Sequence, residues 1–364
     1  MSTPSSTLAG WVGDVGTFTR ERWQRGPAFF TPQNVVAPFG LGELDAAFDG
    51  GLLGTPYLEM VRSDKVVVPP TAYTAPRVVH GATYDGFADR AKVLSLLRDG
   101  ATLLLRRVDQ WHPATGELVA RLSGELDRRV EAFFFVTPIG GQGLAVHRDD
   151  ADVFVLQVAG RKTWYVHDAP AGPDWAPGEL ADDEHSPRLL RGVLAPGDVL
   201  YVPRGFAHRA VGAAGLSAHL SLTVRDIGLR DLRSALERLV TEGLDLPALP
   251  LGEPAIADAC EALLTHYRAR LGAVSAQDVR AAARAQQAHP LTGTAGHAAP
   301  ETLVEAARAW ETGSAEARGG PGGRRPHVAQ AAGRRERRTL KRRRPACRQP
   351  PSSPETPCPS MSPR

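Results

Sequence analysis

The feature that most restricts the fold of this 364-residue chain is a strict alternation of side-chain character over residues 217–224. Successive side chains of an extended strand point to opposite faces, so residues two apart share a face. His219, Ser221 and Thr223 share one face, and the residues between and after them are all apolar. A polar face inside a barrel needs hydrogen-bond partners, and a small anionic ligand could supply them.

Other short β segments surround this strand between residues 131 and 224. Residues 132–136 are rich in Phe, and the segments 153–158 and 162–166 flank residues 159–160, where we expect a hairpin turn. Further short segments follow, with Pro- and Gly-containing turns between them. Many short strands separated by turns predict a β-sandwich or a β-barrel.

Helical patterns flank this β region, so the predicted fold class is α+β. We expect a helical and extended segment at 1–90 that packs on the core, a β-rich domain at 91–228, a helical region at 229–310 and a tail at 311–364. The pattern of apolar residues also predicts a helix at 85–99. The helices of 229–310 either pack onto the β domain or form a homodimer.

The net charge of +3 combines two unlike parts. Residues 314–364 contain 13 Arg and Lys against three acids, a net charge of +10, so residues 1–313 carry a charge of −7. Nucleic-acid binding is therefore not expected of the body. The tail lacks aromatic residues, and we expect it to be disordered: a solvated segment, the product of a shifted reading frame, or a basic arm that contacts a polyanion such as RNA.

The sequence also indicates a compartment. No run of about 18 apolar residues is present, so no membrane span is expected. The first residues lack the basic start and apolar core of a secretory signal. The three cysteines, Cys260, Cys347 and Cys358, are scattered and form neither a disulfide framework nor a zinc motif. These features predict a cytoplasmic protein.

A histidine and an aspartate two residues apart, His147 and Asp149, suggest a metal site. In a strand this spacing places both side chains on one face, where they can occupy adjacent sites on one ion. Residues 197–208 read as a strand and a Pro-containing turn that lead to His208, which can return to the same barrel mouth as a third ligand. Two histidines and one carboxylate form the facial triad of non-haem Fe(II) oxygenases.

Lys162 is unusual because it lies within an otherwise apolar β segment. The chain has only four lysines against 39 arginines, so a lysine at this place indicates a specific role. Lysines are rarely buried unless they are paired, and a carboxylate ligand would provide the pair. We expect the hairpin to place Lys162, Trp164 and Val166 together on one face of a neighbouring strand.

Together these motifs resemble the JmjC-type ribosomal oxygenases, which are cupin-fold, Fe(II)- and 2-oxoglutarate-dependent protein hydroxylases. The resemblance covers about residues 15–230. It rests on Thr137-Pro138, Gly143, His147-Arg148-Asp149, Asp152-Val153-Phe154-Val155-Leu156-Gln157, Gly160-Arg161-Lys162, Trp164 and Tyr201-Val202-Pro203-Arg204-Gly205-Phe206-Ala207-His208.

The resemblance implies a double-stranded β-helix (jelly-roll) core, with residues 91–228 as the JmjC, or cupin, catalytic domain and residues 229–310 as a dimerisation region. It implies that His147, Asp149 and His208 bind the catalytic iron and that Lys162 pairs with the distal carboxylate of 2-oxoglutarate. Ser221 and Thr223 would hydrogen-bond this cosubstrate, and O₂ would be the second cosubstrate. The target would be a His or Arg side chain of a ribosomal protein.

Two departures from the family pattern keep alternatives open. Phe133 and Phe135 occupy positions where the family usually has an Asn and a Tyr, whose polar groups reach the cosubstrate or the target. The basic tail stands where members usually have a winged-helix-like domain. The alternatives are a metal-binding cupin module without catalytic activity and a small-molecule 2-oxoglutarate-dependent hydroxylase.

Overall fold

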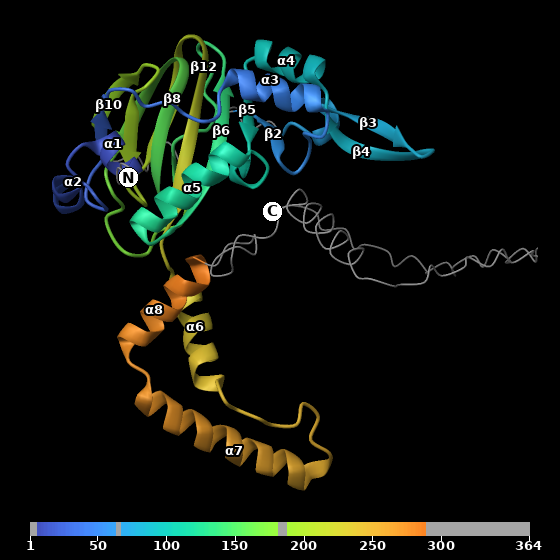
Figure 1. Ribbon diagram of the computed structural model, residues 1–364, viewed down its shortest axis with the longest axis vertical. Helices are drawn as coiled ribbons and strands as arrows, with labels where there is room; N and C mark the ends of the chain where they lie inside the picture. Colours follow the sequence, from blue (N-terminus) through green and yellow to red (C-terminus); the bar gives the residue numbers. More distant parts are fainter. Residues whose placement is uncertain (1–5, 63–66, 181–187, 289–364) are drawn as a thin grey trace, which may run out of the picture. The chain divides into compact units, whose positions relative to one another are not determined.

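The computed structural model describes residues 6–62, 67–180 and 188–288 (Figure 1). A large antiparallel sheet forms its centre, with helices packed against it, in agreement with the predicted α+β class. Within the described ranges, no helix combines the length and apolarity needed to cross a bilayer.

The sheet joins strands from distant parts of the chain. Its main path follows the spatial order β1 (Ala28–Phe30), β11 (Val199–Val202), β8 (Ala151–His167), β12 (His208–Arg225), β6 (Arg129–Thr137), β5 (Thr102–Leu105) and β2 (Leu58–Val61). Three more strands join at the sides: β10 (Arg188–Leu194) pairs with β8, and β7 (His147–Arg148) pairs with both β12 and β9 (Gly178–Glu179). The segment 1–90 therefore adds β1 and β2 to the edges of the sheet.

The predicted hairpin at residues 159–160 is wrong. Strand β8 runs through this point without reversing, and both of its halves pair with β12. Gly160 has a φ of +61°, and a Cβ atom added there would lie 2.3 Å from the carbonyl oxygen of Leu216. The turn-like sequence therefore marks an irregularity in a long strand pair, where only glycine fits the close approach of the two backbones.

The two faces of β12 differ as the alternation predicts. The apolar face enters the main hydrophobic core through Ala218, Leu220, Leu222 and Val224, which are at most 1% exposed. Helices cover this face of the sheet (Figure 1): α1 (Thr7–Val12), α2 (Val15–Glu21) and α5 (Pro113–Leu126). Full burial of a leucine-sized side chain contributes about 1.5–3 kcal/mol, so this packing holds the sheet in place while its opposite face remains available for a site.

The predicted helix at 85–99 begins later than expected. Residues 85–88 belong to β4 (Ala82–Ala88), which forms a separate hairpin with β3 (Thr74–Val79), and helix α4 (Arg90–Arg98) follows. The Asp89 carboxylate accepts hydrogen bonds from the backbone N–H groups of Ala91 and Lys92 at 3.0 and 3.1 Å, which fixes the start of the helix. The other elements here are α3 (Leu41–Gly50) and two short 3₁₀ helices, η1 (Pro70–Ala72) and η2 (Val108–Gln110).

Three helices follow the sheet: α6 (Leu229–Thr241), α7 (Gly252–Ala273) and α8 (Ala276–Ala288). Helix α6 packs against α8, and the Gln287 side chain of α8 donates a hydrogen bond to the carbonyl oxygen of Asp226 at 3.0 Å. Residues 289–310 of the predicted helical region and the whole predicted tail, 311–364, lie outside the described residues. The boundaries of the four proposed domains remain predictions.

Candidate active site

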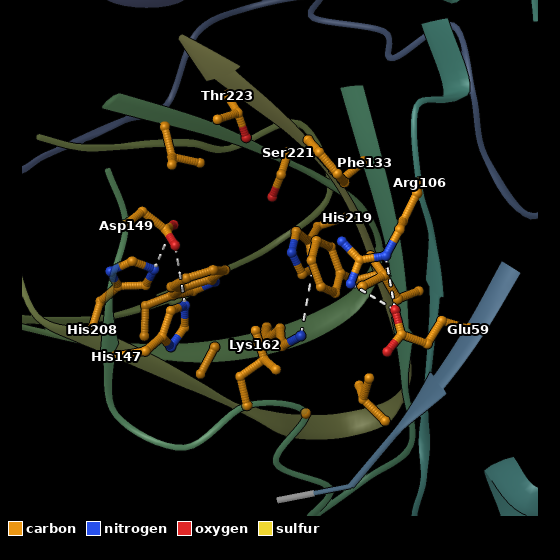
Figure 2. Close-up of a pocket in the computed structure, with 18 of the residues that line it drawn as sticks. Glu59, Arg106, Phe133, His147, Asp149, Lys162, His208, His219, Ser221 and Thr223 are labelled. Atoms are coloured by element: carbon orange, nitrogen blue, oxygen red, sulfur yellow. Dashed lines mark hydrogen bonds and ion pairs between the residues drawn. The ribbon is translucent and has the colours of Figure 1, made fainter. Parts of the chain in front are cut away.

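The face of the sheet opposite the main core borders a cavity of about 330 Å³ (Figure 2). Strands β6, β7, β8 and β12 supply most of its wall, and Glu59 of β2 lies at its side with Arg106. All six predicted site residues line this cavity, namely His147, Asp149, Lys162, His208, Ser221 and Thr223. The structure thus brings together side chains that are up to 76 residues apart in the sequence.

His147, Asp149 and His208 form a compact cluster at one end of the cavity. His147 of β7 is the register partner of His208, the first residue of β12, and the two imidazole centroids lie 4.3 Å apart. The Nε2 atoms of His147 and His208 are 3.8 and 3.5 Å from the Asp149 carboxylate oxygens. Among the described residues, this is the one group of three potential ligands whose donor atoms all lie within 4.8 Å of one another.

Backbone hydrogen bonds fix both imidazoles in the form that a metal requires. His147 Nδ1 lies 2.8 Å from the carbonyl oxygen of Ala145, and His208 Nδ1 lies 3.0 Å from that of Phe206. A carbonyl oxygen only accepts, so each Nδ1 carries the proton and each Nε2 presents its lone pair to the cluster. Burial, with His147 close by, lowers the pKa of His208 to about 4, so this imidazole is neutral at pH 7.

The cluster fits a divalent transition metal. Two ligands held at about 2.0–2.2 Å from one ion can be at most about 4.4 Å apart, and both N···O separations fall within that limit. Two neutral imidazoles and one carboxylate match the donor set of non-haem Fe(II) sites. His147, Asp149 and His208 all line the cavity, so they would hold such an ion at its wall.

Lys162 lies farther along the same cavity (Figure 2). It is 3% exposed, and its Nζ donates a hydrogen bond to Thr137 Oγ1 at 2.9 Å and lies 3.5 Å from His219 Nδ1. Burial lowers the pKa of this amine to about 7. In the part of the chain that the structure describes, no carboxylate pairs with it, so an anionic ligand would find an unneutralised cation here. Lys162 lies on β8 itself, not on a separate hairpin strand as predicted.

Ser221 and Thr223 follow His219 along β12, on the face that the alternation predicts. Ser221 is buried and Thr223 is half-buried. Phe133 of β6 is the register partner of Ser221, and both side chains line the cavity. The register partner of Thr223 is Glu131, so only Ser221 faces an apolar side chain across this strand pair. Within the described ranges, the structure shows no hydrogen bond from either hydroxyl group, so both can bind a ligand.

Two polar features in or next to the cavity are not predictable from the sequence. Thr137 is buried behind the cavity wall and accepts a hydrogen bond from Lys162, a contact that its Thr-Pro motif does not predict. Arg106 and Glu59 form an ion pair at the cavity wall, with N···O distances of 2.6 and 2.8 Å. This pair depends on the register of β2 against β5, which residue spacing alone does not predict.

The comparisons with known proteins agree with this geometry. A family model described as JmjC domain matches residues 112–232. Ribosomal oxygenase 1 of Bos taurus is 33% identical over 190 residues, which are 49% of this chain and 28% of that protein. The Drosophila grimshawi protein named bifunctional lysine-specific demethylase and histidyl-hydroxylase NO66 is 33% identical over 180 residues, which are 46% of this chain and 25% of that protein.

Among solved structures, the X-ray structure of E. coli ycfD is similar, with a TM-score of 0.50, 19% sequence identity, and coverage of 82% of this chain and 78% of that chain. This likeness, together with the antiparallel strand pairing, confirms the predicted cupin-like fold. The chain spans only about a quarter of the length of its curated relatives. Residues 112–232 therefore form a JmjC domain, through which this chain is related to the ribosomal oxygenases as its motifs predicted.

Proposed function

We propose that this protein is an Fe(II)- and 2-oxoglutarate-dependent oxygenase that hydroxylates a protein side chain. One observation carries the proposal: the His147–Asp149–His208 cluster and the buried, unneutralised Lys162 face the same cavity. A metal site alone would suit many functions. A metal site combined with a buried cation matches a ligand that chelates the metal at one end and bears a carboxylate at the other.

Each part of the cavity has a role in this proposal. The triad holds Fe(II), which together with O₂ and 2-oxoglutarate supplies the oxidising chemistry. Lys162 neutralises the distal carboxylate through a charge-assisted hydrogen bond, which is about twice as strong as a neutral one. The hydroxyl groups of Ser221 and Thr223 orient the same molecule. Apolar residues exclude water from the remaining wall, among them Phe133, Phe135, Leu144 and Val153.

The proposed substrate is a His or Arg side chain of a ribosomal protein. Two of the relatives reported above carry the names ribosomal oxygenase and histidyl-hydroxylase, which supports this class. The charge of −7 on residues 1–313 also favours basic partners such as ribosomal proteins. Mass spectrometry of ribosomal proteins from parent and deletion strains tests the assignment. We expect one protein to lose the mass of one oxygen atom in the deletion strain, and no such difference would point to another substrate.

A turnover assay separates this proposal from its rivals. The purified protein with Fe(II), O₂ and 2-oxoglutarate should form succinate, and an Asp149→Ala variant should not. A metal-binding cupin module without activity would give no succinate in either case, and the apolar Phe133 and Phe135 are the observation that favours this rival. A small-molecule hydroxylase would form succinate but would leave every ribosomal protein unmodified.

The location and assembly that we propose are the cytoplasm and a homodimer. The scattered cysteines support a reducing compartment. Helix α7 supports the dimer, because it has no buried residue and exposes Ile256, Leu264 and Leu271 by 42–51%. Light scattering after size-exclusion chromatography should give twice the mass of one chain. A monomeric mass at micromolar concentration would contradict the dimer.

A further inference from the structure

We propose that His219 is a second binding residue for the distal carboxylate of the cosubstrate, to which it donates its Nε2–H group while its Nδ1 atom accepts from Lys162. The inference rests on the proposed function and deepens it. It assigns a specific role to a histidine that the metal site does not use and that the sequence pattern places only on the polar face of its strand.

The position of His219 points to this role. The residue lies on β12, is 2% exposed and lines the cavity between Lys162 and Ser221 (Figure 2). Its Nδ1 atom lies 3.5 Å from the Lys162 ammonium nitrogen. His219 and the triad histidines thus face one cavity from different places along its wall, with the metal ligands at one end and the ammonium beside His219.

Two aromatic rings hold the imidazole in one orientation. Phe135, its register partner on β6, stacks on it with a centroid distance of 4.8 Å and an interplanar angle of 3°. Trp164 meets it edge to face at 5.4 Å and 81°. A ring clamped in this way loses little further entropy when it binds a ligand, because its rotamer is already fixed.

The protonation of His219 follows from its neighbour. Burial, reinforced by the charge of Lys162, lowers the pKa of His219 well below its usual value, so the ring is neutral. A neutral imidazole has one N–H group and one lone pair, and a lysine ammonium can only donate. The lone pair therefore lies on Nδ1, which faces Lys162, and the proton lies on Nε2.

The Nε2–H group of His219 is consequently a hydrogen-bond donor without an acceptor among the described residues. In the described part of the chain, the structure gives Nε2 no hydrogen-bond partner, although the residue is almost fully buried. Buried donors are almost always satisfied by protein, water or ligand. Phe135 offers no acceptor across the strand pair. A carboxylate has two oxygens, so one can accept from the Lys162 ammonium and the other from His219.

Binding measurements without turnover test the inference. Mn(II) replaces iron, and calorimetry compares 2-oxoglutarate with 2-oxobutanoate, which has the same metal-chelating end but no distal carboxylate. The His219→Phe variant keeps an aromatic ring to stack on Phe135 and removes both polar atoms. We expect it to bind 2-oxoglutarate roughly 10- to 150-fold more weakly, the loss expected for one hydrogen bond to a charged group, and to bind 2-oxobutanoate as the wild type does.

Three further variants test whether the Nε2–H group itself is responsible for the loss of affinity. His219→Gln can place an amide N–H near the position of Nε2 and should recover most of the affinity. His219→Asn keeps a polar atom near the position of Nδ1 only, so its affinity for 2-oxoglutarate should stay as low as that of His219→Phe. It also provides the test if the Phe variant does not fold. His112→Phe is the matched control, because His112 packs edge-on against Phe39 and does not line the cavity. It should leave both affinities unchanged.

The outcomes are distinguishable. Unchanged 2-oxoglutarate affinity in both His219→Phe and His219→Asn overturns the inference, as does an equal loss for the two ligands, which would indicate a purely structural residue. In either case the proposed function survives, because the wild type still binds 2-oxoglutarate. A wild-type protein that binds Mn(II) but not 2-oxoglutarate overturns the proposed function and the inference with it.

Discussion

Substituting Lys162 by Met should make the ligand-free protein more stable while it weakens cosubstrate binding. The wild-type amine is almost completely buried, and burial lowers its pKa from 10.5 to about 7. One pKa unit corresponds to about 1.4 kcal/mol, so at pH 7 the buried amine costs the fold up to roughly 4 kcal/mol. Methionine fills a similar volume without this penalty, and Thr137 keeps Thr102 as a hydrogen-bond partner at 3.1 Å.

Lost contacts of the aliphatic chain and local rearrangement will offset part of this gain, so we expect a net stabilisation of about 1–3 kcal/mol. For a domain of this size, each kcal/mol raises the melting temperature by roughly 2–4 °C. The loss of a hydrogen bond from a charged group, about 1.5–3 kcal/mol, should weaken 2-oxoglutarate binding by roughly 10- to 150-fold. Differential scanning calorimetry without ligand and titration calorimetry with Mn(II) and 2-oxoglutarate measure the two effects.

The two predicted effects, higher stability and lower 2-oxoglutarate affinity, have opposite directions, so general damage to the fold cannot explain both. A variant that binds 2-oxoglutarate as tightly as the wild type would refute the role of Lys162. A variant that melts at a lower temperature than the wild type would refute the reasoning that the amine lacks a counter-charge. Lys162→Arg is the charge-preserving control. It should retain part of the affinity, although the larger guanidinium does not fit the space beside Thr137 as the ammonium does.

Other predictions concern the metal site, the cosubstrate and the strand pair. Asp149→Asn should lower the Mn(II) affinity by more than roughly 10- to 100-fold, which is the loss typical of substituting a residue that only hydrogen-bonds a metal ligand. Titration with Mn(II) measures this loss, and an unchanged affinity would contradict the role of Asp149 as a ligand. Wild-type affinity for 2-oxoglutarate should be highest below pH 7, where Lys162 is protonated, and fall as the pH rises above its pKa of about 7; titrations across pH 6–9 check this, and the Lys162→Met variant should lack the decline. Gly160→Ala should destabilise the fold by about 1–3 kcal/mol in urea unfolding, because of its positive φ and the nearby Leu216 carbonyl oxygen, and a neutral result would show that the strands can separate there.

The parts of the site that local patterns encode were predictable. The alternation at 217–224 gave the cavity face of β12 because side-chain direction in a strand depends only on parity. His147, Asp149 and His208 could be grouped because a metal requires a limited set of donors. Lys162 stood out through its apolar surroundings and the rarity of lysine in this chain. The structure places all of these residues on one cavity.

The parts that depend on long-range pairing were not predictable. The sequence around Gly160 has the composition of a turn, and only the neighbouring β12 backbone shows that the chain continues as one strand. The Glu59–Arg106 ion pair requires the β2–β5 register, which tertiary packing decides. The hydrogen bond from Lys162 to Thr137 joins residues from different strands for the same reason. Spacing along one segment carries no information about such contacts.

The distribution of polar groups around the cavity explains why the fold tolerates an unpaired buried amine. Strand β6 contributes Phe133 and Phe135, neither of which can hydrogen-bond a ligand, so recognition of an anion falls to β8 and β12. With fewer neutral donors, a large part of the affinity must come from charge, and a charge is most effective where water is excluded. Burial of the Lys162 ammonium group therefore lowers the stability of the ligand-free protein, and the same burial strengthens the contact of this group with a bound carboxylate. A Phe135→Tyr substitution, which would add a hydroxyl group beside His219, should accordingly make binding less dependent on Lys162.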